Sequence, residues 1–403
     1  MTSAVRSRLL VSGTSLTTLL FCAHFFNDLF AGTLAALLPT LQVRFAAGEV
    51  LLAAFVATLS FSSSMLQPLF GAVADRVGLS VLPNIKNKTT SAILSLMGVA
   101  SSPWLLLPLL LFGGLGSAAF HPAAISLARS AASRNRGLAM GIFSAGGTFG
   151  MALGPLVIGL FLINGWLHLT PWLMVPGVLF GLLIYLLVPA QPQDPAARRS
   201  KLFDAELFTG PVGRLCLAGV LRSISWTAII NGAPLWLVHA RGLGPTSATL
   251  FITITTFTIA GALGGILSGL VEHRFSRQVL VTGSMLAAIV PLALMLVTPP
   301  GSALYYLCVA LAGMLVNGGL PIMVVSAQDM APHAIATVSG MMMGLTWGTA
   351  GVLYLGVGAV QGAIGMNAAM AMSVLPLLPG ALIAYRVLGS RTTALASAPT
   401  TAP

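Results

Sequence analysis

The chain has 403 residues, of which 57% are hydrophobic and only 7% are charged. A soluble domain carries about 25% charged residues, so this composition excludes a soluble protein and indicates an integral membrane protein. The net charge of +11 does not indicate a nucleic-acid partner, because basic residues of membrane proteins gather in their cytoplasmic loops.

Twelve apolar stretches are long enough to cross a bilayer, since a transmembrane helix needs roughly 20 apolar residues. The predicted spans are 16–38, 50–72, 79–100, 104–127, 137–162, 171–188, 212–237, 247–271, 278–298, 303–327, 335–360 and 367–388. We therefore expect an all-α membrane protein with a six-helix half over 1–188 and a second six-helix half over 212–388. A cytoplasmic linker over 189–211 joins them, and a small, polar tail over 389–403 is expected to be disordered.

The third predicted span differs from the others because its first half is polar. Lys86 and Lys88 lie there among asparagines, and only 89–100 is continuously apolar. At 1.5 Å per residue this apolar part reaches about 18 Å, so the helix is expected to start late or to be distorted. The sequence suggests no role for the polar segment 84–88.

The positions of Lys and Arg predict the orientation. With the N-terminus inside, 16 of the 19 basic residues fall on inside segments, and Arg222 lies within a span. Only Arg44 and Arg241 fall on outside loops. Basic residues favour the cytoplasmic side, so both termini are predicted to be cytoplasmic, and an even number of spans requires the same.

The two halves also resemble each other at a fixed spacing. Gly71–Arg76 aligns with Gly269–Arg274 at an offset of 198, and Pro122 aligns with Pro321 at an offset of 199. Duplicated halves related by an axis along the membrane normal build large secondary transporters, whose substrate binds between the halves near the midplane.

The loop after the second span resembles the signature of the major facilitator superfamily, G-x-x-x-D-R-x-G. Its residues here are Gly71, Asp75, Arg76 and Gly78, although Leu79 follows where the family has a basic residue. The resemblance implies a gating role for these four residues at the cytoplasmic helix ends. The alternative is that Asp75 and Arg76 form an ordinary solvated turn.

A second motif lies in the fifth span, where Gly141, Gly150, Gly154, Pro155 and Gly159 resemble the motif of drug/proton antiporters in that superfamily. Glycines four residues apart let another helix approach closely, and a proline can bend the helix. We expect Gly150, Gly154 and Pro155 to act in gating. Generic packing of small residues is the alternative.

Four further segments resemble the fosmidomycin-resistance-type exporters of the same superfamily. These are His24–Asp28, Gln67-Pro68, Gly114–Pro122 and Arg222-Ser223. The resemblance covers most of the chain and implies transport of a small molecule out of the cell.

Asp28 is the one acidic residue that lies deep in a predicted span. A charged residue at a helix centre costs about 2.5–3.5 kcal/mol on insertion scales, so it normally faces a cavity or a partner. His24 is four residues away on the same helix face, and Asn27 lies beside them. We predict that Asp28 carries the coupling proton and that Arg222 can act as its counter-charge. A purely structural Asp28–Arg222 pair is the alternative.

The remaining candidate substrate-binding residues are polar or aromatic side chains within the spans. Together with the first helix they give the predicted set His24, Asn27, His121, Arg222, Trp226, Asn231, Asn317 and Trp347. For His121 a hydrogen bond within the bundle, and for the tryptophans simple packing, are the alternatives.

The sequence thus predicts a proton-coupled secondary transporter that exports a small drug-like or anionic compound across a prokaryotic inner membrane. Alternatives are a proton-coupled uptake symporter for a metabolite or siderophore, and a non-transporting receptor on the same scaffold. No phosphate-binding loop ending in Lys-Ser or Lys-Thr occurs, which argues against ATP-driven transport. We expect no enzymatic activity, cofactor, metal or nucleic acid, and a monomer whose partners are substrate, protons and lipid. Substrate identity and transport direction do not follow from the sequence.

Overall fold

The computed structural model describes residues 13–70, 89–131, 136–187 and 205–396, and within these ranges the chain forms helices and no strand. Eleven helices are long and apolar enough to cross a membrane, and a shorter apolar helix, Thr89–Val99, lies where the third of the twelve spans was predicted. The predicted all-α membrane fold is confirmed. Gly71, Asp75, Arg76, Gly78, Lys86 and Lys88 lie outside the described residues.

The described N-terminal part of the chain contains five of the long helices and the shorter helix Thr89–Val99. Their elements are α2 (Gly13–Phe45), α3 (Glu49–Ser60) with the π-helix η1 (Phe61–Met65), the helix Thr89–Val99 ending in η2 (Ser95–Val99), α6 (Pro103–Ala131), α7 (Arg136–Ile163), and η3 (Leu167–Leu173) with α8 (Met174–Leu187).

The C-terminal half contains six further spans, after the short helix α9 (Ala205–Thr209). Their elements are α10 (Pro211–His239), α11 (Ala248–Val271), α12 (Arg277–Ala287) with α13 (Ile289–Val297), α14 (Ala303–Gly318) with α15 (Leu320–Met330), α16 (Ile335–Gly340) with the π-helix η6 (Met341–Leu345) and α17 (Thr346–Ile364), and α18 (Met366–Met372) with α19 (Leu377–Ala396).

Helix ends differ from the predicted ones where apolar content is a poor guide to helical length. Helix α2 runs through Pro39 to Phe45 and so passes the predicted end at residue 38, although the residues after Pro39 are less apolar. The described part of the third span is Thr89–Val99, and its last five residues form the 3-10 helix η2. The polar segment before it lies outside the described residues. Helix α19 continues to Ala396, past residue 388 at which the last span was expected to end and a tail to begin.

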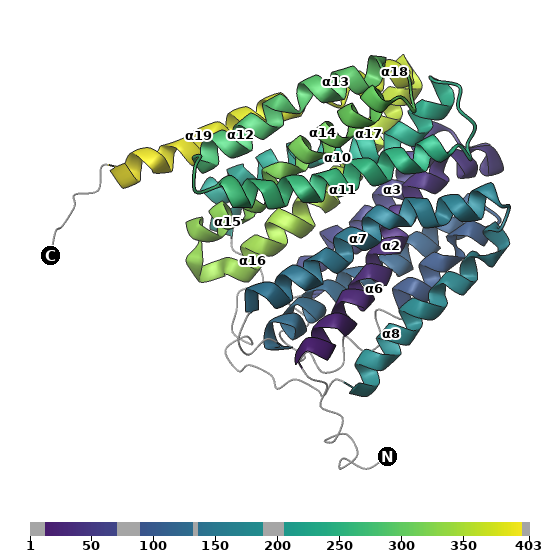
Figure 1. Cartoon of the computed structure of the whole chain (residues 1–403), viewed down its shortest axis with the longest axis horizontal. Helices are drawn as coiled ribbons and strands as arrows, with labels where there is room; N and C mark the ends of the chain where they lie inside the picture. The colour runs from purple at the N-terminus through teal and green to yellow at the C-terminus, as the bar shows by residue number, and fades with distance from the viewer. Residues whose placement is uncertain (1–12, 71–88, 132–135, 188–204, 397–403) are drawn as a thin grey trace, which may run out of the picture.

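Figure 1 shows the two halves side by side, with the first half in purple to teal and the second in green to yellow. The start of α2 and the end of α19 lie at the same end of the bundle. Two long seams join the halves, since α3 and η1 pack along α17 and α7 packs along α11, and α2 also contacts α10.

The α3–α17 seam is tight because glycines of α17 face the second span. A Cβ atom added to Gly348 would lie 2.6 Å from the Met65 nitrogen, and one added to Gly351 would overlap Ser60. The π-helices η1 and η6 also contact each other at this seam. Single π-turns within α-helices are frequent at functional sites, and this seam contains one π-helix from each half.

The α7–α11 seam is held by a hydrogen bond between the halves. Thr255 Oγ1 donates to the carbonyl oxygen of Ala152 at 2.8 Å. Phe251 packs against Gly159 of α7, where no side chain larger than hydrogen fits. The described parts of α7 and α11 are continuous α-helices, without a π-turn.

The two arginines assigned to outside loops have the same structural role in each half. Arg44, at the end of α2, donates to the Gly98 carbonyl at 2.8 Å, and Arg241, just after α10, donates to the Leu296 carbonyl. The acceptors are terminal carbonyls of the third span of each half, where a positive charge is favourable. The offsets, 197 for the arginines and 198 for the acceptors, repeat the spacing that the sequence shows for the duplication.

A charged cluster joins three helices of the second half, at the end of the bundle where α2 begins (Figure 1). Arg277 Nε contacts Glu272 Oε1 at 2.6 Å, and Arg277 Nη1 contacts Asp329 Oδ2 at 2.6 Å. These residues follow α11, begin α12 and end α15, so the cluster fixes these three helix ends relative to one another.

Candidate functional site

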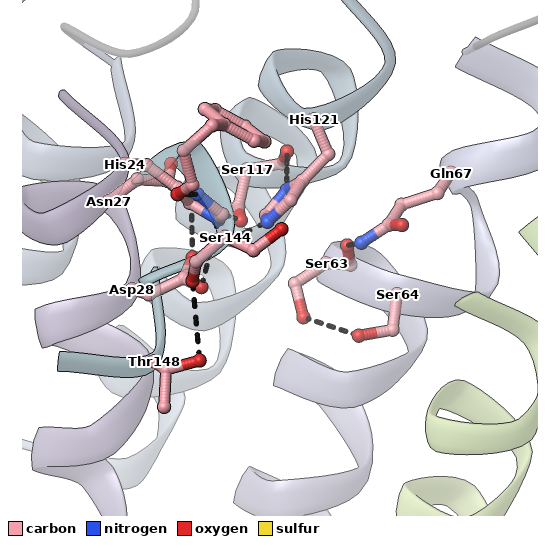
Figure 2. Close-up of polar contacts among 11 residues, drawn as sticks. His24, Asn27, Asp28, Ser63, Ser64, Gln67, Ser117, His121, Ser144 and Thr148 are labelled. Atoms are coloured by element: carbon pink, nitrogen blue, oxygen red, sulfur yellow. Dashed lines mark hydrogen bonds and ion pairs between the residues drawn. The ribbon is translucent and has the colours of Figure 1, made fainter. Parts of the chain in front are cut away.

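Asp28 lies between two histidines from different helices. Its Oδ2 atom is 3.2 Å from His24 Nε2, one turn earlier on α2, and its Oδ1 atom is 3.4 Å from His121 Nε2 on α6. Figure 2 shows both imidazole rings turned toward the carboxylate. Asp28 and His24 are buried, and His121 is half-buried. The predicted association of His24 with Asp28 is found, and His121 joins them.

The other ring nitrogen of each histidine is held by the main chain. His24 Nδ1 lies 2.8 Å from the Phe143 carbonyl oxygen of α7, and His121 Nδ1 lies 2.9 Å from the Ser117 carbonyl oxygen. A carbonyl oxygen only accepts hydrogen bonds, so both Nδ1 atoms must carry the proton. In a neutral histidine of that tautomer, Nε2 has a lone pair and no proton.

With both histidines neutral, two Nε2 lone pairs would therefore face a carboxylate. Lone pairs facing an ionised carboxylate repel it, so the short contacts require a positive centre between the atoms. One or two protons shared with Asp28 satisfy this requirement. The His24, Asp28 and His121 ligand atoms also lie within 4.8 Å of one another, so a single metal cation is the other occupant that this geometry could hold.

Asn27 fixes the carboxylate from the side. Its Nδ2 donates to Asp28 Oδ1 at 2.8 Å and to Ser117 Oγ at 2.8 Å. Asn27 is almost completely buried, with 1% of its surface exposed. It therefore holds α2 to α6 at the height of the acid, and sets the side from which His121 approaches.

Helix α7 covers the Asp28–His24 pair with backbone and not with side chains. A Cβ atom added to Gly147 would overlap both His24 Nε2 and Asp28 Oδ2. Gly150 and Gly154 face main-chain carbonyls of α2, at Phe25 and Leu29. The predicted close approach at Gly150 and Gly154 is found, but Gly147, which contacts the site itself, was missed. It lies outside the glycine spacing that the antiporter-like motif uses.

Several hydroxyl and amide side chains near Asp28 were also missed. Ser144 and Thr148 lie beside it on α7, and Figure 2 shows Ser63, Ser64 and Gln67 on the side of the second span that faces His121. Gln67 Nε2 donates to the Ser63 carbonyl at 2.9 Å, which positions its amide. Serine and threonine are common in membrane helices, so sequence alone gives no signal that separates these from packing residues.

Arg222 of α10 forms a second polar centre in the other half. Its side chain is completely buried, donates to Asn317 Oδ1 at 2.9 Å and to Ser223 Oγ at 2.9 Å, and lies 5.5 Å from the centre of the Trp347 ring. Trp347 in turn packs edge-on against Trp226 at 5.6 Å. The offset of 198 that relates the halves pairs Arg222 with His24.

The Asp28–Arg222 contact that the sequence suggested is not formed. Asp28 contacts His24 and His121 within its own half, and the polar partners of Arg222 belong to the second half. The physical reason is that each charged group finds polar partners within its own half. Asp28 has the two histidines, and Arg222 has an amide and a hydroxyl. The structure therefore places two separate polar centres where the sequence suggested one.

The other predicted residues fall into two groups. Asn317, Trp226 and Trp347 gather around Arg222, whereas the amide of Asn231 donates to the Thr227 carbonyl at 2.9 Å on its own helix. Pro155 is buried within α7, which remains a continuous helix through it.

The comparisons with known proteins agree with this architecture. Residues 20–355 match the family model of the Major Facilitator Superfamily, and the chain belongs to that family. An uncharacterized MFS-type transporter of Bacillus subtilis, YfnC, is 28% identical over 376 residues, covering 88% of each chain. The fosmidomycin resistance protein of Escherichia coli is 26% identical over 341 residues, covering 82% of each. The multidrug resistance protein MdtG of Klebsiella pneumoniae is 31% identical over 205 residues, 49% of each chain.

Solved structures share the fold at low sequence identity. A bacterial homologue of the lysosomal transporter Spinster, captured inward-facing and occupied, superimposes with a TM-score of 0.73 at 16% identity, covering 96% of this chain and 99% of that one. The nucleoside transporter NupG superimposes with a TM-score of 0.73 at 16% identity, covering 92% and 98%. The chain is therefore a multi-pass membrane protein of a transporter family, with relatives of the drug-resistance type.

Proposed function

We propose that this protein is a proton-coupled exporter of a small drug-like or anionic compound, working by alternating access in a prokaryotic inner membrane. One observation carries the proton coupling: Asp28 faces two histidine Nε2 atoms that have no proton of their own in the neutral state. Such a group binds protons at a defined place, and releasing them changes the contacts between helices.

The coupling follows from which helices the site joins. Asp28 and His24 belong to α2, His121 belongs to α6, and His24 is tied to α7 through the Phe143 carbonyl. Loss of the shared protons replaces attraction between Asp28 and His121 with repulsion, and thereby pushes α2 and α6 apart. Helix α7 forms one seam with the second half, so this movement reaches the seam through Thr255 and Ala152.

Two features support export. Two relatives carry resistance names, for fosmidomycin and for several drugs, and resistance is what an exporter gives to its cell. The α7 glycines Gly150 and Gly154 pack on α2 as the resemblance to drug/proton antiporters implies. Both termini would then lie in the cytoplasm, and a monomer with both halves would suffice for the cycle.

The test begins with a drug-sensitive bacterium that produces the protein and is challenged with fosmidomycin and a panel of structurally varied toxic compounds. Compounds that the cells tolerate are then added to everted membrane vesicles, in which respiration has made the interior acidic and a pH-sensitive dye reports the gradient. An exporter that exchanges protons for the compound partly dissipates the gradient.

We expect the parent protein to dissipate the gradient and Asp28→Asn, produced at the same level, not to do so. Gradient dissipation by Asp28→Asn equal to that of the parent would contradict the assignment. Uptake of the compound by intact cells, without resistance, would show a symporter instead. Adding a chelator to the vesicles tests the other occupant of the site, since a metal-coupled carrier would lose the response.

A further inference from the structure

Arg222 is a buried cation that has no counter-charge among the residues the structure describes. Arg222 is completely buried, and among the described residues no carboxylate lies within salt-bridge distance of it. Its hydrogen-bond acceptors are the neutral Asn317 amide, the Ser223 hydroxyl and, at 3.5 Å, the Val316 carbonyl. A guanidinium removed from water is normally paired with an anion, so the site is electrostatically incomplete.

The guanidinium is also incompletely hydrogen-bonded. Arg222 Nε is buried and has no hydrogen-bond partner. Nε and a terminal nitrogen of arginine form a fork that matches two oxygens of a carboxylate, phosphate or phosphonate. The unused donor thus belongs to a group whose geometry is suited to an oxyanion.

Trp347 lies over the Arg222 guanidinium, close to the α3–α17 seam. Trp347 stacks near the guanidinium, is itself only half-buried, and follows the π-helix η6 by two residues. Its neighbour Gly348 abuts Met65 of the second span. Opening of the α3–α17 seam would free the helix segment that carries Trp347 from its contact with Met65, and would give access to the arginine.

We propose that Arg222 is the docking point for an anionic group of the transported compound: a carboxylate, phosphate or phosphonate oxygen pair that binds Nε and a terminal nitrogen behind Trp347. This inference rests on the proposed transport function and names the substrate class. The anion binds in the C-terminal half and the protons bind in the N-terminal half. Substrate and protons then bind to different halves. Binding of one affects binding of the other through the contacts between the halves, and not through a shared atom.

Binding is measured as the rise in unfolding temperature of the purified protein in detergent, at constant ionic strength and pH. The probes are methylphosphonate, phenylphosphonate and benzoate, with benzamide as an uncharged match for benzoate. We expect the anions and not benzamide to stabilise the parent. Arg222→Gln should weaken anion binding about tenfold to a hundredfold, the loss of one charge-assisted pair. Arg222→Lys, which keeps the charge but not the fork, should be intermediate.

Arg241→Gln is the matched control, because Arg241 Nε is likewise buried without a hydrogen-bond partner and its guanidinium lies 4.8 Å from the Trp236 ring centre. Arg241 is bound to a helix-end carbonyl, so its loss should lower the unfolding temperature without probe and leave anion binding unchanged. Arg222→Gln should not lower it, since it removes an uncompensated buried charge.

Three outcomes overturn the proposal. The first two are that no anion stabilises the parent, or that the anions stabilise Arg222→Gln as much as the parent. A fall in the probe-free unfolding temperature of Arg222→Gln as large as that of Arg241→Gln, with anion binding retained, shows a structural arginine and also overturns it. The assay needs no proton gradient, so a failure of proton coupling leaves its result unaffected.

Discussion

Replacing Gly147 by alanine tests the site without removing any of its polar groups. The added Cβ atom would lie 2.6 Å from Asp28 Oδ2, and would overlap His24 Nε2 as well, whereas ordinary contact begins at 3.4 Å. The carboxylate oxygen must therefore retreat by about 0.8 Å. Hydrogen bonds weaken over a few tenths of an ångström, so the 3.2 Å contact between His24 and Asp28 does not survive such a shift unchanged.

The size of the effect can be bounded from general magnitudes. Overpacking a filled interior costs about 1–3 kcal/mol, which lowers the unfolding temperature but leaves a folded protein. A displacement of about 1 Å at a reacting group reduces rates by about a hundredfold. We expect Gly147→Ala to fold, to reach the membrane and to lose proton-driven transport by about tenfold to a hundredfold.

The assay is gradient dissipation in everted vesicles, read together with the unfolding temperature of the purified variants. Gly356→Ala is the control, because no atom lies within 4 Å of its added carbon. The reasoning is refuted if Gly147→Ala transports like Gly356→Ala, or if its loss of transport is matched by a general loss of folded protein.

Two further predictions concern contacts away from the proton site. Thr255→Val removes the hydrogen bond to the Ala152 carbonyl, worth about 0.5–1.5 kcal/mol, and should shift the protein toward the state in which the α7–α11 seam is open; unchanged accessibility of cysteines placed along the seam to a water-soluble maleimide would disprove it. Arg277→Gln breaks two ion pairs of residues about a third to a half exposed, so it should lower stability by less than about 1 kcal/mol, and less still in 1 M salt. A larger, salt-independent loss would show that the cluster does more than join exposed helix ends.

The fold could be predicted from the sequence because each helix that crosses a membrane requires a long apolar segment. Apolar length marks the spans, and the Gly71/Gly269 spacing of 198 marks the duplication. The structure shows that duplication in the paired carbonyl contacts of Arg44 and Arg241. No pattern in the sequence could assign those contacts, because an arginine near a helix end reads simply as an exposed loop residue.

The site was only partly predictable, for a reason visible in its residues. His24 and Asp28 are four residues apart on one helix, so their contact follows from helix geometry alone. The contact of Asp28 with His121 depends on how α2 and α6 rotate against each other, which side-chain packing decides. Arg222 was predicted to be the counter-charge because it is the basic residue that lies within a span. Charge and depth in the membrane do not show which half of the protein will supply its partners.

The central claim is that the Asp28 group binds the coupling proton, and net transport compared with exchange tests it most directly. Proteoliposomes containing the parent or Asp28→Asn are loaded with a compound identified by the resistance screen. Net flux is driven by an imposed pH gradient, and exchange of labelled for unlabelled compound is measured at equal pH. We predict that Asp28→Asn loses the pH-driven net flux and retains exchange, since only net flux requires the proton to be taken up and released. Net flux in Asp28→Asn that follows the pH gradient as in the parent would contradict the account.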